Sequence, residues 1–311
     1  MKKAICKILG ALLVSYTSLH AEVDIDTDDF GAENIHPFSN SDEQRPFSVN
    51  ITGDAVGKAD FKKWYLDDQH LEYRDIEIEG SAVFYYDPSC EEALAISVGY
   101  EYTRLAWSQN PFFNETKFHT VDVSLGLFTH RAQNWFWRAQ LSLNLDPDHL
   151  NFNEYTSYDG VLWGRYDYCS NIGIHTGLIF QTGMKIDRVY PIIGFDWQIT
   201  DSWKLNVVYP VNMSLVYQWN RCWSLAVAAR ALDHRQRVSQ TEPLSKGLWA
   251  YRSKGVEGAV NYDYNSWLHA NLHAGYTLGT KLTISDRHNR HKRHFKLDSA
   301  GYFGGEVQAS F

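Results

Sequence analysis

The stretch "WFWRAQLSLNL", residues 135–145, alternates between two kinds of side chain along its length. Its odd-numbered positions are all apolar: Trp135, Trp137, Ala139, Leu141, Leu143 and Leu145. Its even-numbered positions after Phe136 are polar: Arg138, Gln140, Ser142 and Asn144. A period of two puts successive side chains on opposite faces of a β-strand. The stretch therefore predicts a strand with an apolar surrounding on one face and a polar one on the other.

The same pattern recurs from Phe47 to the end of the chain, as in "HTVDVSLGL" (119–127), "EALAISVGYEY" (92–102) and "NLHAGYTLGTKLTI" (271–284). A helical period of comparable length is not found. The alternation predicts about fourteen strands, with twelve to sixteen as the range allowed. They are expected near 47–56, 71–86, 93–107, 117–129, 135–145, 157–168, 172–182, 189–198, 203–209, 213–219, 223–232, 254–264, 269–284 and 298–311.

The first 45 residues differ from the rest. Residues 1–21 combine a basic start, a short apolar run and a small residue, Ala21, which is typical of a secretory signal peptide. Residues 22–45 are acidic and poor in apolar side chains, so we expect a disordered periplasmic segment, with a short lumen plug as the alternative. Residues 46–311 then form one domain. The chain carries a net charge of −8, and losing the leader makes it more negative, which argues against a nucleic-acid partner.

The connections between the expected strands alternate in length. Those after even-numbered strands are brief and turn-like, whereas most after odd-numbered strands are long: 57–70, 108–116, 146–156, 233–253 and 285–297. Bacterial outer-membrane barrels have an even strand number, short periplasmic turns and longer outer loops. Six of the 11 Trp residues also lie beside the short turns, where amphipathic rings favour a bilayer interface. We therefore expect an all-β, transmembrane, antiparallel up-and-down barrel in the outer membrane of a Gram-negative bacterium, rather than a soluble sheet.

Two resemblances extend this interpretation. The last strand, "GYFGGEVQASF", ends on Phe311 and resembles the C-terminal signature that the barrel assembly machinery recognises in outer-membrane proteins, although Ala309 stands where a larger hydrophobe is usual. The stretch "PIIGFDWQITDSWKLNVVYPVNMSLVY" is similar to an uncharacterised family of predicted outer-membrane barrels of chlamydial type. The residues that carry this similarity are Pro191, Gly194, Trp197, Trp203, Leu205 and Pro210. The family implies location and fold, and no activity.

The strand registers predict which charged side chains face the lumen. Those expected inside are Asp54, Glu77, Glu79, Glu101, Asp122, Arg138, Arg165, Asp196, Lys204, Arg230, Glu257, Asp263, Lys281 and Glu306. Unpaired charges in a dry core cost several kcal/mol, whereas a wet channel tolerates them. Acids outnumber bases, so an open lumen is expected to prefer cations. Paired charge networks that seal the lumen are the alternative.

No catalytic motif is found in the chain, so we expect no enzyme and no cofactor. The most unusual loop is "DRHNRHKRHFK", whose basic residues are Arg287, His288, Arg290, His291, Lys292, Arg293 and His294. It is expected to contact anions such as the phosphates of lipopolysaccharide, or to be simply a solvated loop. Histidines at this spacing without acids or cysteines are weak evidence for a metal site.

The most direct function for such a barrel is a passive pore for small polar solutes with weak cation preference. The alternative is a non-conducting structural or adhesin-like protein that acts through its outer loops. Cys90, Cys169 and Cys222 all fall in short turns, too far apart for internal bridges. The chlamydial resemblance implies a disulfide-stabilised envelope, so these thiols are candidates for crosslinks to other envelope proteins, with three idle thiols as the alternative.

Overall fold

The computed structural model describes residues 45–265 and 267–311. The expected signal peptide and most of the segment 22–45 lie outside the described residues. The strands are β1 Phe47–Asp60, β2 His70–Asp87, β3 Glu92–Trp107, β4 Lys117–Thr129, β5 Trp135–Leu145, β6 Thr156–Cys169, β7 Ile172–Gly183, β8 Ile186–Thr200, β9 Trp203–Tyr209, β10 Asn212–Gln218, β11 Trp223–Arg237, β12 Leu248–Tyr264, β13 Leu268–Ser285, β14 Arg293–Leu297 and β15 Gly301–Ser310. A single turn of 3₁₀-helix, Trp64–Leu66, follows β1. Within the described residues, no helix is long and apolar enough to cross a bilayer.

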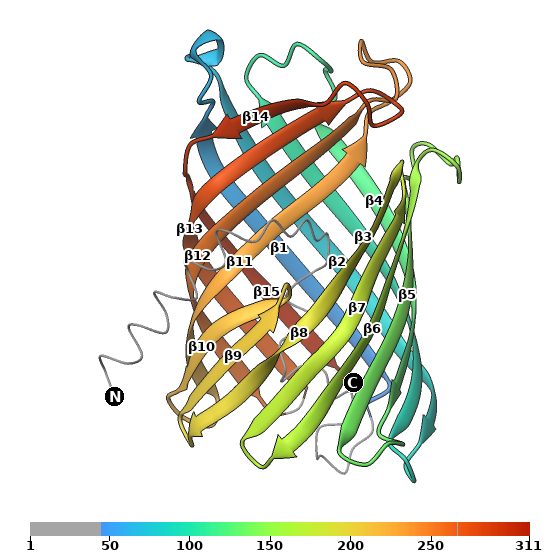
Figure 1. The fold of residues 1–311 in the computed structure, drawn as a ribbon, viewed down its shortest axis with the longest axis vertical. Coiled ribbons are helices and arrows are strands. Elements are labelled where there is room, and N and C mark those ends of the chain that lie inside the picture. The colour runs from blue at the N-terminus through green and yellow to red at the C-terminus, as the bar shows by residue number, and fades with distance from the viewer. Residues whose placement is uncertain (1–44, 266) are drawn as a thin grey trace.

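Each strand pairs antiparallel with its sequence neighbour from β1 to β13, and β15 pairs with both β13 and β1, which closes a barrel of 14 strands (Figure 1). β14 is an extra short strand that pairs only with the end of β13. Where β15 meets β1, the backbone N–H of Phe311 donates to the carbonyl of Phe47 at 2.9 Å, and the bond from the Phe47 N–H to the Phe311 carbonyl is 3.1 Å. The final residue thus ties the last strand to the first. The expected all-β, antiparallel up-and-down barrel of 14 strands is confirmed.

Two ends of the barrel differ, as the sequence predicted. The long-loop end carries the connections 61–69, 108–116, 146–155, 238–247 and 286–300. The short-turn end carries 88–91, 130–134, 170–171, 201–202, 219–222 and the turn before Leu268. The short β7–β8 turn lies at the long-loop end, whereas the short β9–β10 turn lies only part-way up the wall (Figure 1). β9 and β10 are separate strands, joined by Pro210 and Val211.

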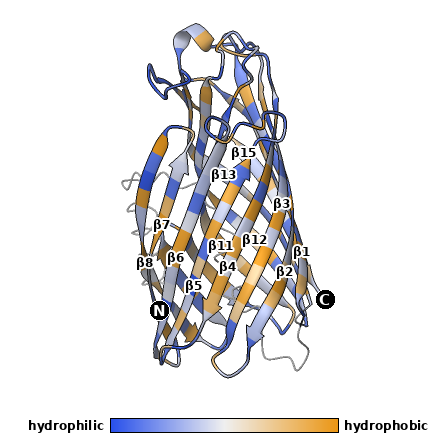
Figure 2. Cartoon of the chain, turned by 90° about the vertical axis from the view of Figure 1, so that its right-hand side faces the viewer, coloured by the Kyte–Doolittle hydropathy of each residue, from blue (hydrophilic) through white to orange (hydrophobic). Residues whose placement is uncertain are grey.

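The outer surface of the barrel body is apolar. Leu125, Leu141, Ile193 and Leu272 are 50 %, 59 %, 65 % and 71 % exposed, although all four are large hydrophobic side chains in the middle of strands. Figure 2 shows hydrophobic and hydrophilic residues alternating along β3, β4 and β5, with hydrophilic loops at the upper end. Such exposure in water costs about 1.5–3 kcal/mol per side chain, and lipid removes that cost.

Pairs of aromatic side chains lie at the short-turn end of the barrel. The rings of Trp135 and Trp137 stack with centroids 5.0 Å apart, and Trp203 lies 4.8 Å from Tyr217. Trp223 lies 4.6 Å from Tyr262 on the neighbouring strand. Rings with an apolar body and a polar tip are stabilised at a membrane–water interface. These pairs form the girdle that the turn-proximal Trp residues predicted.

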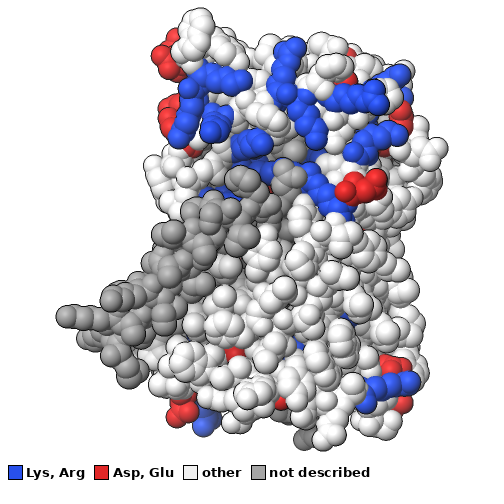
Figure 3. All heavy atoms as spheres, in the orientation of Figure 1, with Lys and Arg blue, Asp and Glu red and all other residues white. Residues whose placement is uncertain are grey.

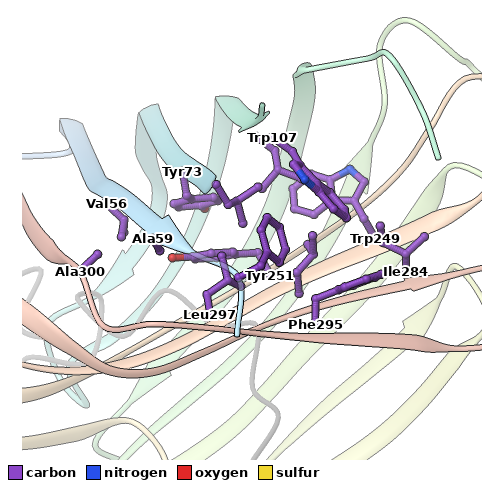
Figure 4. Packing of buried hydrophobic residues seen from close by; sticks show 14 of the residues in the cluster. Val56, Ala59, Tyr73, Trp107, Trp249, Tyr251, Ile284, Phe295, Leu297 and Ala300 are labelled. Atoms are coloured by element: carbon purple, nitrogen blue, oxygen red, sulfur yellow. The ribbon is translucent and has the colours of Figure 1, made fainter. Parts of the chain in front are cut away.

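The lumen at the long-loop end is filled by side chains. We call this cluster the aromatic plug; it consists of Val56, Ala59, Phe61, Leu66, Leu71, Tyr73, Leu105, Trp107, Phe113, Phe118, Val238, Trp249, Tyr251, Leu282, Ile284, Phe295, Leu297, Ala300 and Tyr302. Tyr73 and Tyr251 stack across the lumen with an interplanar angle of 4° and centroids 4.4 Å apart (Figure 4). Phe61 stacks on Trp107 at 4.5 Å. With apolar packing, the plug fills the part of the lumen near the long-loop mouth that β1–β4 and β12–β15 surround.

Candidate functional site

A polar cavity of about 280 Å³ occupies the lumen beside the plug. We call it the lumen cavity. Its lining shares Tyr73 with the aromatic plug and Val161 with a second apolar group, the inner cluster of Phe136, Val161, Trp163, Ile179, Ile192, Val208 and Val211. The cavity therefore borders two apolar clusters and is lined mainly by polar side chains.

Acidic side chains line one wall of the lumen cavity. Asp75, Glu77 and Glu79 alternate along β2 and point inward, and Glu77 lies directly opposite Glu101 on β3. Asp54 on β1 and Asp122 on β4 extend the same wall on either side. These carboxylates lie together because alternate side chains of β2 point inward and because the neighbouring strands pair with β2 in this register.

Arginines reach the cavity from the strands that follow. Arg138, Arg188, Arg230 and Arg235 come from β5, β8 and β11. Most of the acidic side chains thus come from β1–β4, whereas the arginines come from β5, β8 and β11. This arrangement sets up an electric field across the cavity, and a field of this kind acts on charged and dipolar solutes.

Glu101 also has a buried partner from the far strands. His234 of β11 lies 3.0 Å from the Glu101 carboxylate through Nδ1, and its Nε2 lies 3.1 Å from the hydroxyl of Thr103. Trp249 of the aromatic plug packs against the same imidazole, with ring centroids 5.3 Å apart. The cavity wall and the plug are therefore connected through one histidine.

A charged network crosses the lumen between β11 and β1. Arg230 Nη2 donates to Asp54 at 2.9 Å, and His273 Nε2 lies 2.8 Å from the other oxygen of the same carboxylate. Glu257 lies 3.6 Å from Arg230 and accepts a hydrogen bond of 3.0 Å from the Tyr302 hydroxyl. All five side chains are buried, so their charges are compensated by one another rather than by bulk water.

A second network lies nearer the short-turn end. Arg165 holds Asp196 through Nε at 2.9 Å, and His175 approaches the same carboxylate at 2.6 Å. Trp163 donates from Nε1 to the other nitrogen of His175 at 3.2 Å. Asp167 pairs with the second face of the Arg165 guanidinium at 2.5 Å. This network borders the inner cluster, of which Trp163 is a member.

The residues expected to face the lumen can now be placed. Asp54, Glu77, Glu79, Glu101, Asp122, Arg138 and Arg230 line the lumen cavity. By strand register, the remaining inward members lie outside its lining: Arg165, Asp196, Lys204, Glu257, Asp263 and Glu306. The structure does not bring all of them into one site.

The expectation for Lys281 is wrong. A bulge in β13 pairs Thr277 with Gly255 and Gly279 with Lys254, so Leu278 is skipped and the alternation shifts by one residue. Beyond the bulge, Leu282 and Ile284 point inward into the plug and are fully buried. Lys281 therefore projects from the outer surface, between Arg252 and Lys296 of the neighbouring strands.

Several lumen residues were not expected from the sequence. Asp75 and Arg188 line the cavity, and His175, His234 and His273 lie inside the ionic networks. Asp75 sits two residues before Glu77, so the alternation alone contains the signal for it. Alternation also places His273 on the polar face of its strand, but it does not reveal the partner, because His273 and Asp54 are 219 residues apart.

The basic loop connects β13 to β14. Asp286 accepts a hydrogen bond from His291 at 2.8 Å and two backbone N–H bonds, from Arg290 at 2.8 Å and His288 at 2.9 Å. The bond from His291, followed by that from the Arg290 amide, lowers the Asp286 pKa to about 2. Arg287, Lys292, Arg293 and His294 are exposed on or just beyond the same loop. In the described part of the chain, no group of three or more His, Cys, Asp or Glu is arranged to hold a metal ion.

The three cysteines of the described chain lie at the short-turn end and form no bond with one another. Cys169 is exposed, and its thiol contacts Asn171 at 3.0 Å. Cys90 and Cys222 are partly exposed in their turns.

Residues 89–308 match the model of a family described as a domain of unknown function, DUF6268. The chain belongs to this family. An uncharacterised protein of Chlamydia pneumoniae is 28% identical over 284 residues, covering 86% of this chain and 88% of the relative. An uncharacterised protein of Chlamydia trachomatis is 24% identical over 283 residues, with the same coverage of 86% and 88%. The expected membership in an uncharacterised, chlamydial-type family is confirmed.

Solved structures with similarity to this DUF6268 member include two outer-membrane channels. The COG4313 outer membrane channel from Pseudomonas putida F1 gives a TM-score of 0.46 at 8% identity and covers 88% of this chain and 100% of that one. A mutant of the TodX monoaromatic hydrocarbon channel gives 0.44 at 9% identity, with coverage of 86% and 91%.

Proposed function

We propose that this DUF6268 barrel is an integral outer-membrane protein that lets small polar solutes pass passively, with a weak preference for cations. The apolar outer face and the aromatic girdle support the membrane location, because both match the solvent requirements of a bilayer. The location proposal puts the long-loop end outside and the short-turn end in the periplasm. We propose no enzymatic activity.

The observation that carries the proposal is the lumen cavity. A space of about 280 Å³ with eight acidic side chains in its lining, against four arginines, is suited to water and small polar solutes rather than to lipid tails. The lining acids are Asp54, Asp75, Glu77, Glu79, Glu101, Asp122, Asp159 and Asp233. The excess of carboxylates favours cations, and this preference is strongest at low salt.

A solute can therefore cross the lumen only if the aromatic plug moves or if the solute enters the lumen cavity beside the plug. Trp249 and Tyr251 are fully buried in the plug, whereas Thr182, Met184 and Ile186 of the β7–β8 hairpin line the lumen cavity beside it. We therefore expect low conductance from the resting protein and rare openings. Fourteen strands lie between filled barrels of eight strands and open ones of sixteen, which fits a narrow passage.

A second candidate function is favoured by the same plug. A barrel sealed by apolar packing and by the Arg230–Asp54 network can serve as a non-conducting scaffold that displays its outer loops. In that case the loops bind a surface partner and the lumen only needs to be stable. The two candidates predict opposite results when the plug is weakened.

Further partners belong to the same proposal. The barrel contacts lipid, the basic loop from Arg287 to His294 faces the phosphates of lipopolysaccharide, and Phe311 is read by the barrel assembly machinery. Cys90, Cys169 and Cys222 lie in an oxidising periplasm and crosslink to other envelope proteins. Non-reducing gels of native envelopes test the last point: a monomer band that reductant does not change contradicts it.

Planar-bilayer recording tests the conduction proposal. The folded protein should give small, infrequent current steps, and Trp249→Ala should raise their size or frequency because it removes a fully buried ring from the plug. Trp219→Ala is the matched control, since this ring is 68% exposed at the other end. Folding of each variant is checked by heat-modifiable migration on gels. If folded wild type and Trp249→Ala are both silent, the scaffold alternative holds.

Selectivity is tested in the same apparatus. Under a salt gradient, the reversal potential should have the sign of a cation-preferring pore and should shrink in Glu77→Gln/Glu79→Gln, which removes two lining carboxylates. Glu91→Gln, in a short turn outside the cavity, should leave it unchanged. Anion preference in wild type contradicts the proposed selectivity.

A further inference from the structure

The barrel wall is incomplete in one place. β8 pairs with β9 only from Ile193 to Thr200, and β11 pairs with β10 only from Ser224 to Ala229. Above the β9–β10 turn, residues 186–192 of β8 and residues 230–237 of β11 therefore face each other with no strand between them. We call this stretch of the wall the seam; it lies between β8 and β11 at the front of Figure 1.

The seam is bridged at its long-loop end by contacts from the β7–β8 turn. Arg235 of β11 donates from Nη2 to the carbonyl of Gly183 at 3.2 Å. Asn289 of the basic loop donates from Nδ2 to the carbonyl of Lys185 at 3.1 Å. These two bonds hold the β7–β8 turn against the outer side of β11–β13, and a small second cavity remains beneath it.

We call this second cavity, which has a volume of about 50 Å³, the basic pocket. Its charged lining consists of Arg188, Arg235, Arg252, Lys281 and Lys292. Its neutral polar lining consists of Thr283, Ser285, Asn289 and His294. Among the described residues that line it there is no Asp or Glu. The volume corresponds to about four water molecules, which is enough for one tetrahedral oxyanion.

The carboxylate of Asp233 accepts a bond of 3.0 Å from Arg252 Nε, and Asp233 lines the lumen cavity rather than the basic pocket. Burial, together with the positive charges of Lys281 and Lys292, lowers the pKa of His294, which is the response of an imidazole held among cations. An anion in the pocket relieves this repulsion.

The pocket lies where the apolar belt ends. Arg252, Lys281 and Lys296 are register neighbours on the outer face of β12, β13 and β14. Leu278, which precedes them toward the short-turn end, is an apolar side chain that is 54% exposed. Figure 3 shows Lys and Arg gathered over the upper part of this face and few charged atoms on the body below it. Cations at this height meet the headgroup layer of the leaflet that surrounds the long-loop end.

We propose that the basic pocket binds a phosphate group of an outer-leaflet glycolipid, held by Arg188, Arg235 and Lys281 at the seam. Guanidinium groups suit phosphate because they offer paired N–H donors, and a lysine adds a mobile point charge. This site is distinct from the solvent-exposed part of the basic loop, since it is built mainly on strands. It rests on the proposed outer-membrane location, because a glycolipid phosphate is available only there.

The site also has a structural consequence for the wall. Ile186, Arg188 and Arg235 line both the basic pocket and the lumen cavity, so a phosphate bound in the pocket sits against side chains that border both spaces. A bound glycolipid would therefore fasten β8 to β11 where hydrogen-bonded strands are missing. We expect bound lipid to raise the thermal stability of the barrel.

The experiment compares wild type with Lys281→Gln/Lys292→Gln, which removes two cations and leaves Arg252 in place to neutralise Asp233. Lys117→Gln is the matched control, an exposed lysine at the same end of β4. Folded protein in detergent is titrated with diphosphorylated lipid A, with the same lipid after phosphatase treatment, and with inorganic phosphate, and binding is measured by native mass spectrometry and by the shift in unfolding temperature.

We expect lipid A to bind and stabilise both wild type and Lys117→Gln. The double variant should bind lipid A at least tenfold more weakly. The dephosphorylated lipid should bind weakly to all three proteins. Equal binding by the double variant, or by the dephosphorylated lipid, overturns the phosphate site. Binding of inorganic phosphate as tight as that of lipid A overturns the glycolipid as the ligand. Cell fractionation tests the outer-membrane location separately, so its failure is distinguishable from failure of the pocket.

Discussion

Arg230 of β11 and Asp54 of β1 are joined at 2.9 Å across the inside of the barrel, between side chains 176 positions apart in the chain. In the wall itself, β12, β13 and β15 separate these two strands. Glu257 and His273 complete the charges around the pair, and all four are buried. Arg230 and Asp54 also line the lumen cavity, so contacts inside the barrel contribute to the stability of the fold.

The Arg230 network should be necessary for stability. Arg230→Met leaves Asp54 and Glu257 buried without their guanidinium, and breaking a buried pair from one side costs about 3–5 kcal/mol. The free energy of unfolding in lipid vesicles, from urea titration, measures this. The double variant Arg230→Met/Asp54→Asn should recover part of the loss. Arg221→Met, in an exposed turn, should change the stability by less than about 0.5 kcal/mol, and an equal loss there would contradict the account.

Strand facing can be tested by placing arginine on each side of the wall. At outward Leu125 or Leu141 it should destabilise by about 2–4 kcal/mol if the position lies near the bilayer midplane. At inward Ser124 and Ser142, which share a hydrogen bond of 2.7 Å, the cost should be much smaller because the lumen is polar. The readout is again the unfolding free energy in vesicles. Equal costs on both faces would falsify the assigned alternation.

The bulge in β13 predicts a labelling pattern. In a background with Cys90, Cys169 and Cys222 changed to serine, Lys281→Cys should react with a membrane-impermeant maleimide on intact cells, since it lies on the outer surface at the long-loop end. Thr280→Cys should not react, because Thr280 is only 3% exposed and points inward. The reverse pattern would mean that the bulge is misplaced, and no reaction at either site would place the long-loop end in the periplasm.

The basic loop should keep its shape at unusually low pH. The Asp286 pKa lies at about 2, below the ordinary 3.8, because of its bonds from His291 and the Arg290 amide. A lowered carboxyl pKa stabilises the folded loop above pH 3.8, and this stabilisation is lost as the pH falls toward 2. The carboxyl carbon shift of labelled Asp286 should therefore titrate near 2, and His291→Ala should move the midpoint upward. A midpoint near 3.8 in wild type would rule out the hydrogen-bonded loop.

Much of the wall could be predicted because lipid and lumen impose opposite requirements on alternate residues. Even the weakest expectation, two strands on either side of Pro210 and Val211, is confirmed by β9 and β10. The prediction failed where this contrast ends. Residues 233–237 and 248–253 were expected to be loop, yet they extend β11 and β12. Near the plug the inward side chains of β12, Trp249 and Tyr251, are aromatic, and side chains on the opposite face, such as Asp233 and Arg252, are charged. β14 was hidden in the basic loop for the same reason, since only Phe295 and Leu297 mark its inward face.

The candidate site was predictable only in part. Alternation alone gives inward carboxylates such as Glu77 and Glu101. It cannot show that His234 meets Glu101 or that Arg230 meets Asp54, because these contacts depend on how the closed barrel brings distant strands together. A bulge has no reliable signature in one sequence, so Lys281 was assigned to the wrong face. The seam likewise follows from the relative lengths of four strands, which single-strand patterns do not define.

The central claim is that solutes cross through the lumen cavity, and chemical modification inside that cavity during single-channel recording tests it most directly. In the cysteine-free background, Ser142→Cys places one thiol in the lining, and Leu141→Cys places one on the lipid face of the same strand. A small cationic methanethiosulfonate reagent should reduce the cation current of the Ser142→Cys protein in a single step that dithiothreitol reverses, and should leave the Leu141→Cys current unchanged. Current through the Ser142→Cys protein that the attached group does not alter would contradict the claim.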